Sequence, residues 1–177
     1  MNIVYISGSP RKNSNTEILL LETMRVTGGS LIKLSDYHIE PCGACWACLR
    51  LGDCVLRDDM RNTIVPMLLE SEGIVIGSPV FFNNVSAQTK AFMDRTWYIK
   101  GKLRNKIGGA IVVGQRYGFE SAITAIHAFF LKHEMIPANR GVNGIAFDEK
   151  DILDDNRAMV AAQYLGQRIK ELGGILR

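Results

Sequence analysis

Short apolar runs alternate along this chain with segments that have helical spacing. Strand-like runs rich in β-branched or apolar residues occupy 2–7, 30–34, 73–77, 106–114 and 141–146. The helical segments begin near Ser14, Asp58, Ser86, Phe119 and Leu153. Such alternation predicts successive βα units, and therefore a parallel sheet with helices on both faces. Pro66 lies inside the second helical segment and predicts a kink or a later helix start there.

Length and composition indicate one globular domain. The 177 residues are enough for a single domain, 1–177, with a sizeable core, and the 47% hydrophobic and 22% charged content is typical of globular proteins. The net charge is only +3, with Lys and Arg scattered, which argues against a nucleic-acid partner. No apolar run approaches the roughly 18 residues that a membrane-spanning helix needs. We therefore expect a cytoplasmic protein that binds neither nucleic acid nor a membrane.

All four cysteines of the chain lie in one segment, 37–57, between the second strand and the second helix. Cys42, Cys45, Cys48 and Cys54 are separated by two, two and five residues, and glycine and alanine between them let the backbone wrap closely. This spacing favours a 4Fe–4S cluster ligated by all four thiolates. A zinc site is the alternative, although structural zinc sites usually join two cysteine pairs across a longer loop. Disulfides or buried structural thiols would explain the close spacing less well, and clustered free thiols suit a reducing compartment.

The segment after the first strand is typical of a phosphate site. Gly8 permits the turn, Ser14 and Glu17 have the spacing of a capping box, and the free amides at a helix start favour an anion. The side chains expected to surround the phosphate are Ser9, Arg11, Ser14, Asn15 and Thr16. The glycine pattern is neither that of a dinucleotide fold nor that of an ATP-binding loop. A polar βα turn without a ligand is the alternative interpretation.

Two further loops leave the carboxyl ends of strands at the same edge of the predicted sheet, where doubly wound folds bind ligands. After the third strand, Pro79 and Asn83 can shape a loop in which Phe81 and Phe82 lie on a flat ring. Because adjacent strand residues point in opposite directions, we also expect one of these two aromatics in the core. The fourth strand ends at Gly114 and leads into a second, less specific loop.

Together these segments resemble the flavodoxin-like FMN reductase superfamily, and more closely the iron–sulfur flavoprotein family of anaerobic archaea and bacteria. The segments that carry the resemblance are Gly8-Ser-Pro-Arg11 with Asn15-Thr16, the cysteine run, Gly77-Ser-Pro-Val80 with Val85-Ser-Ala-Gln88, and Phe92-Met-Asp-Arg95. The resemblance implies an α/β, flavodoxin-like, doubly wound sheet of five parallel strands in the order 2-1-3-4-5. It also implies one FMN and one 4Fe–4S cluster per subunit, in a homodimer or homotetramer.

The same resemblance assigns roles to individual residues. Ser9, Arg11, Ser14, Asn15 and Thr16 would hold the FMN phosphate. The isoalloxazine ring would be bordered by Pro79, Val80, Phe81, Phe82 and Asn83, with Gly114 on the neighbouring strand. One departure is visible, because 117–120 reads Tyr-Gly-Phe-Glu where many relatives look more like Gly-Gly-Gln-Glu. This difference leaves the shape of the pocket over the flavin, and the final acceptor, open.

Cofactor chemistry then suggests a function. A cluster passes single electrons and a flavin takes one or two. We expect an electron-transfer oxidoreductase that is reduced by ferredoxin or a similar one-electron donor and reduces a small-molecule acceptor. One alternative is an NAD(P)H-dependent FMN or quinone reductase whose cysteines bind zinc or brace the loop. Another is a non-catalytic redox or metal sensor.

Overall fold

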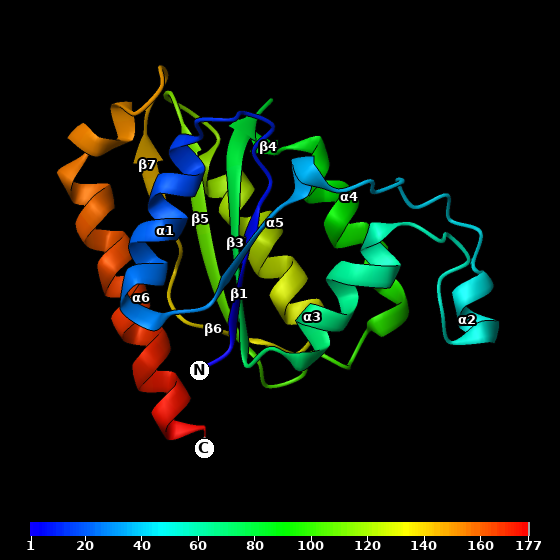
Figure 1. Cartoon of the computed structure of the whole chain (residues 1–177). Coiled ribbons are helices and arrows are strands. Elements are labelled where there is room, and N and C mark those ends of the chain that lie inside the picture. Colours follow the sequence, from blue (N-terminus) through cyan, green and yellow to red (C-terminus); the bar gives the residue numbers. More distant parts are fainter. Residues whose placement is uncertain (177) are drawn as a thin grey trace.

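A parallel sheet forms the centre of the structure, a computed structural model that describes residues 1–176. Its strands are β1 (Ile3–Ser7), β2 (Ser30–Lys33), β3 (Gly73–Phe81), β5 (Ile107–Gly114), β6 (Ile136–Pro137) and β7 (Val142–Ile145). The order is β2-β1-β3-β5, and β6 and β7 both pair with the far edge of β5 (Figure 1). This confirms the predicted flavodoxin-like topology.

The sheet has seven strands in place of the five that were predicted, for two local reasons. The fifth predicted strand is preceded by β6, which pairs with the first residues of β5, whereas β7 pairs with its last residues. In addition, β4 (Asn84–Val85) folds back antiparallel onto the end of β3. Neither short strand has the alternating pattern from which a strand can be recognised in sequence.

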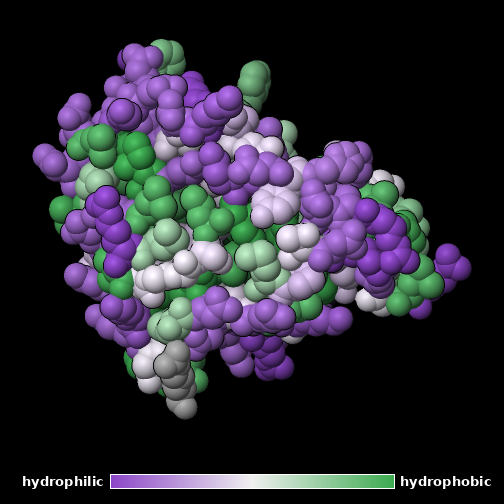
Figure 2. Space-filling model, viewed as in Figure 1, coloured by the Kyte–Doolittle hydropathy of each residue, from purple (hydrophilic) through white to green (hydrophobic). Residues whose placement is uncertain are grey.

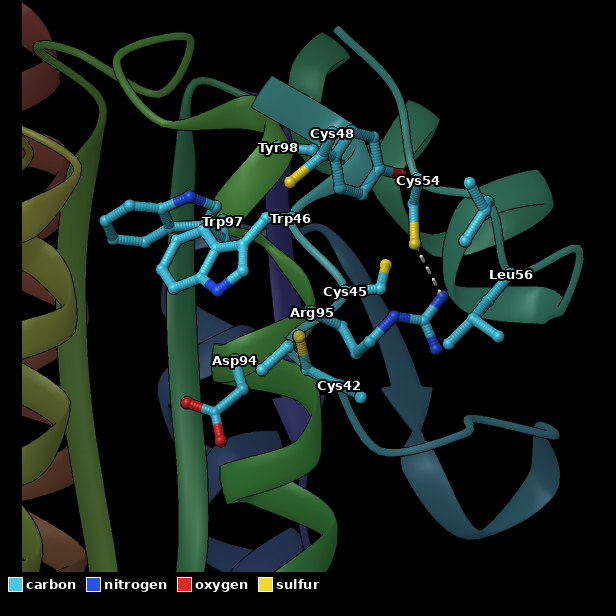
Figure 3. A pocket seen from close by; sticks show the side chains of 13 residues that line it. Cys42, Cys45, Trp46, Cys48, Cys54, Leu56, Asp94, Arg95, Trp97 and Tyr98 are labelled. Carbon is cyan, nitrogen blue, oxygen red and sulfur yellow. Dashed lines mark hydrogen bonds between the residues drawn. The ribbon is translucent and has the colours of Figure 1, made fainter. Parts of the chain in front are cut away.

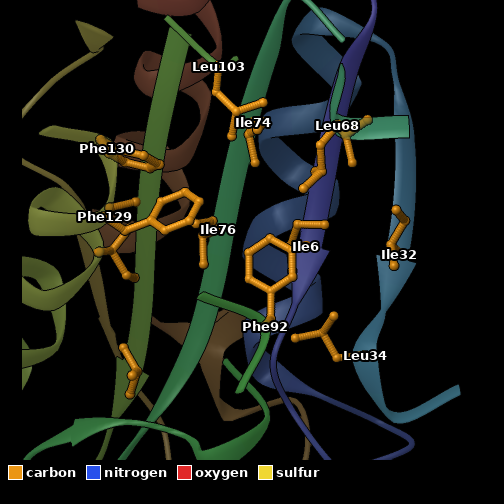
Figure 4. Close-up of a cluster of buried hydrophobic side chains, with 14 of the residues drawn as sticks. Ile6, Ile32, Leu34, Leu68, Ile74, Ile76, Phe92, Leu103, Phe129 and Phe130 are labelled. Atoms are coloured by element: carbon orange, nitrogen blue, oxygen red, sulfur yellow. The ribbon is translucent and has the colours of Figure 1, made fainter. Parts of the chain in front are cut away.

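Helices cover both faces of the sheet (Figure 1). On one face lie α1 (Asn15–Thr27) and α6 (Asn156–Ile175), and on the other lie α3 (Val65–Glu70), α4 (Ala87–Arg95) and α5 (Phe119–Lys132). Successive residues of β1 alternate between the two cores: Ile3 and Tyr5 belong to the core under α1 and α6, and Val4 and Ile6 to the core under α3, α4 and α5. Figure 4 shows Ile6 in the second core, near Phe92 of α4. The sheet is therefore buried on both sides, as a parallel sheet requires.

Three helical segments differ in detail from the prediction. The second predicted helix begins with a π-helical turn, Met60–Ile64, and continues without a break as α3 from Val65. Pro66, which cannot donate a backbone hydrogen bond, directly follows this wider turn as the second residue of α3. A 3-10 turn, Asp151–Asp154, precedes α6. The cysteine segment, expected to be irregular, contains one short helix, α2 (Ala47–Leu51).

The cysteine segment projects from the body of the domain. Figure 1 shows α2 at the end of this projection, away from the sheet, and Figure 2 shows apolar and charged residues side by side on it. Trp46, Leu49, Leu51 and Val55 are exposed there. Within residues 1–176, no helix combines the length and the hydrophobicity that crossing a membrane requires.

Candidate functional site

A hollow of about 210 Å³ lies at the edge of the sheet where β1, β3, β5 and β7 end. Nine of the eleven predicted FMN-binding residues line it: Ser9, Arg11, Ser14, Asn15, Thr16, Pro79, Val80, Phe81 and Gly114. The remaining lining residues, which were not predicted, are Val113, Gln115, Ala146 and Phe147. Gln115 and Phe147 directly follow predicted strands and Ala146 is the last residue of one, so the rule that ligands bind at the carboxyl ends of strands could have indicated all three.

Gly8 sets the shape of the phosphate segment. Its amide donates to the carbonyl of Gly77 at 2.8 Å, and its own carbonyl accepts from the Ser86 hydroxyl at 2.6 Å. A Cβ atom at position 8 would lie 1.8 Å from Thr89 Oγ1. The loop after β1 therefore lies directly against the start of α4, and only glycine allows that approach.

The first turn of α1 faces the hollow. Ser14 is the N-cap residue, and its hydroxyl accepts from the Glu17 amide at 3.4 Å, half of the predicted capping box. The side chain of Glu17 does not complete the box; it accepts from the Ser7 hydroxyl at 3.0 Å and pairs with Lys33. Free amides at this helix start, together with nearby hydroxyls, form a site that favours an anion.

Arg11 and Asn15 also hold the far wall of the hollow. Arg11 Nη1 donates to the carbonyl of Phe147 at 2.9 Å, and Asn15 Nδ2 donates to the carbonyl of Asp148 at 2.6 Å. An arginine has five N–H donors, so this bond leaves donors for a phosphate. The sequence did not indicate these tertiary contacts. Both residues therefore hold the 147–148 segment in place, in addition to their predicted role of binding the phosphate.

Phe82 and Asn83 do not line the hollow. They form the two-residue turn between β3 and β4, both with left-handed backbone angles, φ +49° and +59°. The Phe82 side chain is fully exposed and that of Phe81 is 45% exposed. The expectation that one of the two phenylalanines packs in the core was wrong, because β3 and β4 extend beyond the helix layer as a hairpin.

The hollow fits FMN. Its lining includes one cation, Arg11, and no acidic residue, next to the amide-rich start of α1. Val80, Phe81, Val113 and Phe147 supply apolar surface to the rest of the lining. Donors for a phosphate at one end and an apolar wall beside them match the two parts of a flavin mononucleotide.

A second cavity, of about 290 Å³, contains all four cysteines in its lining (Figure 3). The thiols are free. Left-handed backbone at Ala44, Trp46 and Gly52 turns the segment around this space. Among residues 1–176, no three Cys, His, Asp or Glu side chains converge closely enough to ligate one metal ion. The thiols therefore surround a volume and do not meet at a point.

A buried cation lies against this cavity. Arg95 forms an ion pair with Asp58, with side chains 1% and 4% exposed, and its Nη2 donates to Cys54 Sγ at 3.6 Å (Figure 3). Burial alone would raise the pKa of Asp58, but hydrogen bonds from Arg95 and from the Glu40 amide outweigh it and lower that pKa. Arg95 was part of the motif Phe92-Met-Asp-Arg95, yet the sequence did not indicate that it reaches the cysteines.

Two buried polar groups at this cavity lack partners within the described part of the chain, namely Arg95 Nε and the Tyr98 hydroxyl. Burial, with the nearby Asp53 and Cys54, raises the pKa of Tyr98 to about 12, so its hydroxyl remains a donor. Buried donors without partners are rare, and an acceptor supplied by a bound group accounts for them. Four thiols, one cation and these donors fit an anionic, thiolate-ligated centre.

Two further contacts attach the projecting segment to the body. The Trp46 and Trp97 rings meet edge to face, with centroids 6.1 Å apart, and Arg61 pairs with Asp53. The Nζ atoms of Lys100 and Lys132 lie 5.5 and 5.1 Å from the centroid of Trp97. The cysteine cavity and the flavin hollow have no lining residue in common, so one chain carries two separate sites.

Comparisons with known proteins agree with this architecture. Residues 1–150 match the family described as NADPH-dependent FMN reductase. The chain is 35% identical to an iron–sulfur flavoprotein of Methanocaldococcus jannaschii, with 100% of both chains covered. It is 37% identical to an iron–sulfur flavoprotein of Methanosarcina thermophila, over 99% of this chain and 95% of that one.

Among solved structures, the Trp repressor binding protein from Bacillus subtilis has the same fold. Its TM-score is 0.73 at 21% identity, with 93% of this chain and 97% of that chain covered. A shared fold does not by itself establish the family, so the assignment rests on the sequence matches. This chain belongs to the iron–sulfur flavoprotein family, within the NADPH-dependent FMN reductases, and is a flavin-dependent oxidoreductase.

Proposed function

We propose that this oxidoreductase transfers electrons through a 4Fe–4S cluster in the cysteine cavity to FMN in the hollow beyond β1, β3, β5 and β7. When bound, the cluster supplies one-electron chemistry and the flavin couples it to two-electron reduction of a small acceptor. The observation that carries the proposal is the shared cavity of Cys42, Cys45, Cys48 and Cys54. Four thiols around one volume suit a polymetal centre better than a single ion.

The protein's own residues bind and orient in this proposal. The hydroxyls of Ser9 and Thr16, the α1 amides and the Arg11 guanidinium hold the phosphate, while Val80 and Phe81 border the ring. No acidic or basic side chain needs to transfer a proton at the cluster. The role of the cysteine segment is to fix the ligands and to set the charge and hydration around them.

The proposed partners follow from one-electron chemistry. The donor is ferredoxin or a similar one-electron carrier in the cytoplasm, and the acceptor is a small molecule. We further propose a homodimer or homotetramer, supported by the exposed aromatic rim of the flavin hollow. Phe81, Phe82, Tyr117 and Phe147 are exposed around it, and exposed apolar rims of this kind mark contact surfaces.

Anaerobic iron and acid-labile sulfide analysis of the purified protein tests the cluster. We expect iron and sulfide in equal amounts and a broad brown absorption beside the flavin bands. Zinc without acid-labile sulfide would contradict the proposal. Stopped-flow reduction tests the donor: reduced ferredoxin should reduce the protein quickly, with the cluster reduced before or together with the flavin.

The family match keeps one competing function open, an NAD(P)H-dependent FMN or quinone reductase in which the cysteines bind zinc or brace the loop. The same stopped-flow experiment separates the two. Under our proposal, NAD(P)H reduces the flavin slowly, since a hydride donor would make the four thiolates redundant. Rapid reduction by NAD(P)H, unchanged in a Cys48→Ala variant, would support the competing function.

A further inference from the structure

Arg95 is placed to act on both ends of the cysteine segment. It is the last residue of α4 and lies on the domain body, whereas the residues it contacts belong to the projecting segment and its flanks. Its side chain is almost completely buried, and its ion-pair partner within residues 1–176 is Asp58. A buried cation is costly unless it is paired and fully hydrogen-bonded, so its placement here requires an explanation.

The guanidinium connects the two ends directly. Nη1 donates to the Glu40 carbonyl and to Asp58 Oδ2, both at 2.5 Å. Nη2 donates to Asp58 Oδ1 at 2.9 Å and to Cys54 Sγ at 3.6 Å. Asp58 Oδ2 also accepts from the Glu40 amide at 2.9 Å. Residues 40 and 58, which bracket all four cysteines, are therefore held together by the Arg95 guanidinium, which bonds to both, and by the direct bond from the Glu40 amide to Asp58.

We propose that Arg95 is a positioning residue of the cysteine site, an inference that rests on the proposed cluster. With Asp58 it closes the segment 40–58 before any metal centre is bound, so the entropy cost of bringing the two ends of that loop together does not fall on metal binding. Its Nη2 then donates a hydrogen bond to the sulfur of Cys54 when that sulfur is a ligand. Arg95 thereby adds a positive charge and a donor to a centre that is otherwise coordinated only by thiolates.

Arginine suits this position better than lysine. Its planar group offers five donors in a fixed fork, and four of them are used by the partners on Glu40, Asp58 and Cys54. An ammonium group has three donors and a different reach, so it cannot serve all of these acceptors. Hydrogen bonds to ligand sulfurs and nearby charge both set the reduction potential of a cluster. A cation favours the more negative, reduced state and raises that potential.

Trypsin cleavage of the full chain, loaded with FMN but not yet with iron, tests the closure without any cluster activity. Arg50 and Arg57 are exposed cleavage sites inside the segment. We expect Arg95→Lys to speed cleavage after these residues about tenfold, the population change that loss of one charge-assisted hydrogen bond produces. The matched control is Arg61→Lys, which alters the more exposed pair with Asp53 on the same segment and should change cleavage far less.

The reduction potential of the reconstituted cluster, followed by electron paramagnetic resonance, tests the bond to Cys54. Arg95→Lys should lower the potential, and Arg61→Lys should leave it unchanged. If Arg95→Lys does not accumulate as folded protein, the double variant Arg95→Gln/Asp58→Asn, which leaves no buried charge unpaired, replaces it with the same expected results.

Three outcomes would overturn the inference: wild-type cleavage rates in the Arg95 variants, faster cleavage with an unchanged potential, or equal effects of Arg61→Lys. Failure of the proposed function looks different. In that case the wild-type chain takes up no acid-labile sulfide, while the cleavage comparison still reports on the Arg95–Asp58 closure.

Discussion

Arg11 Nη1 donates a hydrogen bond of 2.9 Å to the backbone carbonyl of Phe147, so the segment after β1 and the segment after β7 form one continuous wall. Asn13 and Asn15 add two side-chain contacts between the same segments, to Glu149 and Asp148. A residue predicted to bind phosphate is thus also a tertiary support. Its two tasks can be separated experimentally, because only one of them depends on the phosphate.

Arg11→Ala should weaken FMN binding by about tenfold to a hundredfold, the range for loss of a charge-assisted hydrogen bond. Riboflavin, which lacks the phosphate, should lose far less, as titration of the apoprotein would show. Asn13→Ala is the matched control, because Asn13 also supports the 148–149 segment but does not line the hollow. Equal losses for both ligands would mean that Arg11 acts only on the wall.

Gly8→Ala should destabilise the protein by about 1–3 kcal/mol, as overpacking of a close contact does. The new Cβ would lie 1.8 Å from Thr89 Oγ1, so the segment after β1 must move away from α4. Urea unfolding of the cluster-free protein measures the change. Gly43→Ala is the control, since its added Cβ meets nothing within 4 Å; similar costs at the two positions would contradict the packing argument.

Phe82→Asn should stabilise the protein by about 1 kcal/mol, because left-handed backbone costs bulky residues that much and asparagine tolerates it. Phe82 is fully exposed, so little packing is lost. Thermal unfolding measures the stability. The same variant should weaken FMN less than Phe81→Ala does, because Phe81 lines the hollow and Phe82 does not. If Phe82→Asn weakened FMN binding more than Phe81→Ala does, Phe82 would contact the isoalloxazine ring as first predicted.

His133 predicts a stability loss in mild acid. Burial, aided by the charge of Lys100, lowers its pKa from 6.5 to about 4. Thr96 Oγ1 donates to the Met93 carbonyl and therefore accepts from His133 Nε2–H, so the neutral ring carries its proton on Nε2. Between pH 6.5 and about 4, His133 is mostly protonated in the unfolded chain and mostly neutral in the folded chain. Stability should therefore fall by up to about 3 kcal/mol as the pH drops from 6.5 to 4.

His133→Gln keeps a donor for Thr96 and removes the titration, so the slope of unfolding free energy against pH over this range should become shallower. His38→Gln serves as the control, because His38 is exposed. His127, whose pKa burial also lowers, contributes to the slope that remains, and so does Asp58 at the acid end of the range, because its pKa is lowered as well. An unchanged slope in His133→Gln would show that His133 binds a proton equally well in the folded and the unfolded chain.

Replacing any one of Cys42, Cys45, Cys48 or Cys54 by alanine should abolish or convert the cluster and leave FMN in place, because the chain has no fifth cysteine to substitute. Iron, sulfide and flavin are measured on each variant under anaerobic conditions. The separation of the two sites predicts the retention of flavin. A variant with full cluster content would remove that cysteine from the ligand set.

The sequence alone was sufficient for the main strands and helices of the fold and for their succession along the chain. Strand-like runs such as 73–77 and 106–114 are apolar on both faces, which only a sheet covered on both sides accommodates, and each is followed by an amphipathic helix. The cysteine spacing and the Ser14 cap are equally local, because the relevant residues are neighbours in the chain. The short strands β4 and β6 were missed because pairing with β3 and β5, not local pattern, creates them.

Only the tertiary structure decided which distant residues support the sites. Arg11 contacts Phe147 across 136 positions, and Arg95 reaches Cys54 across 41. No periodicity or motif encodes such contacts; they arise because parallel strands bring their carboxyl ends to one edge, and because α4 ends where the cysteine segment leaves the body. The sequence thus determined which chemical groups are present, whereas packing determined that a buried arginine would lie against a cysteine sulfur.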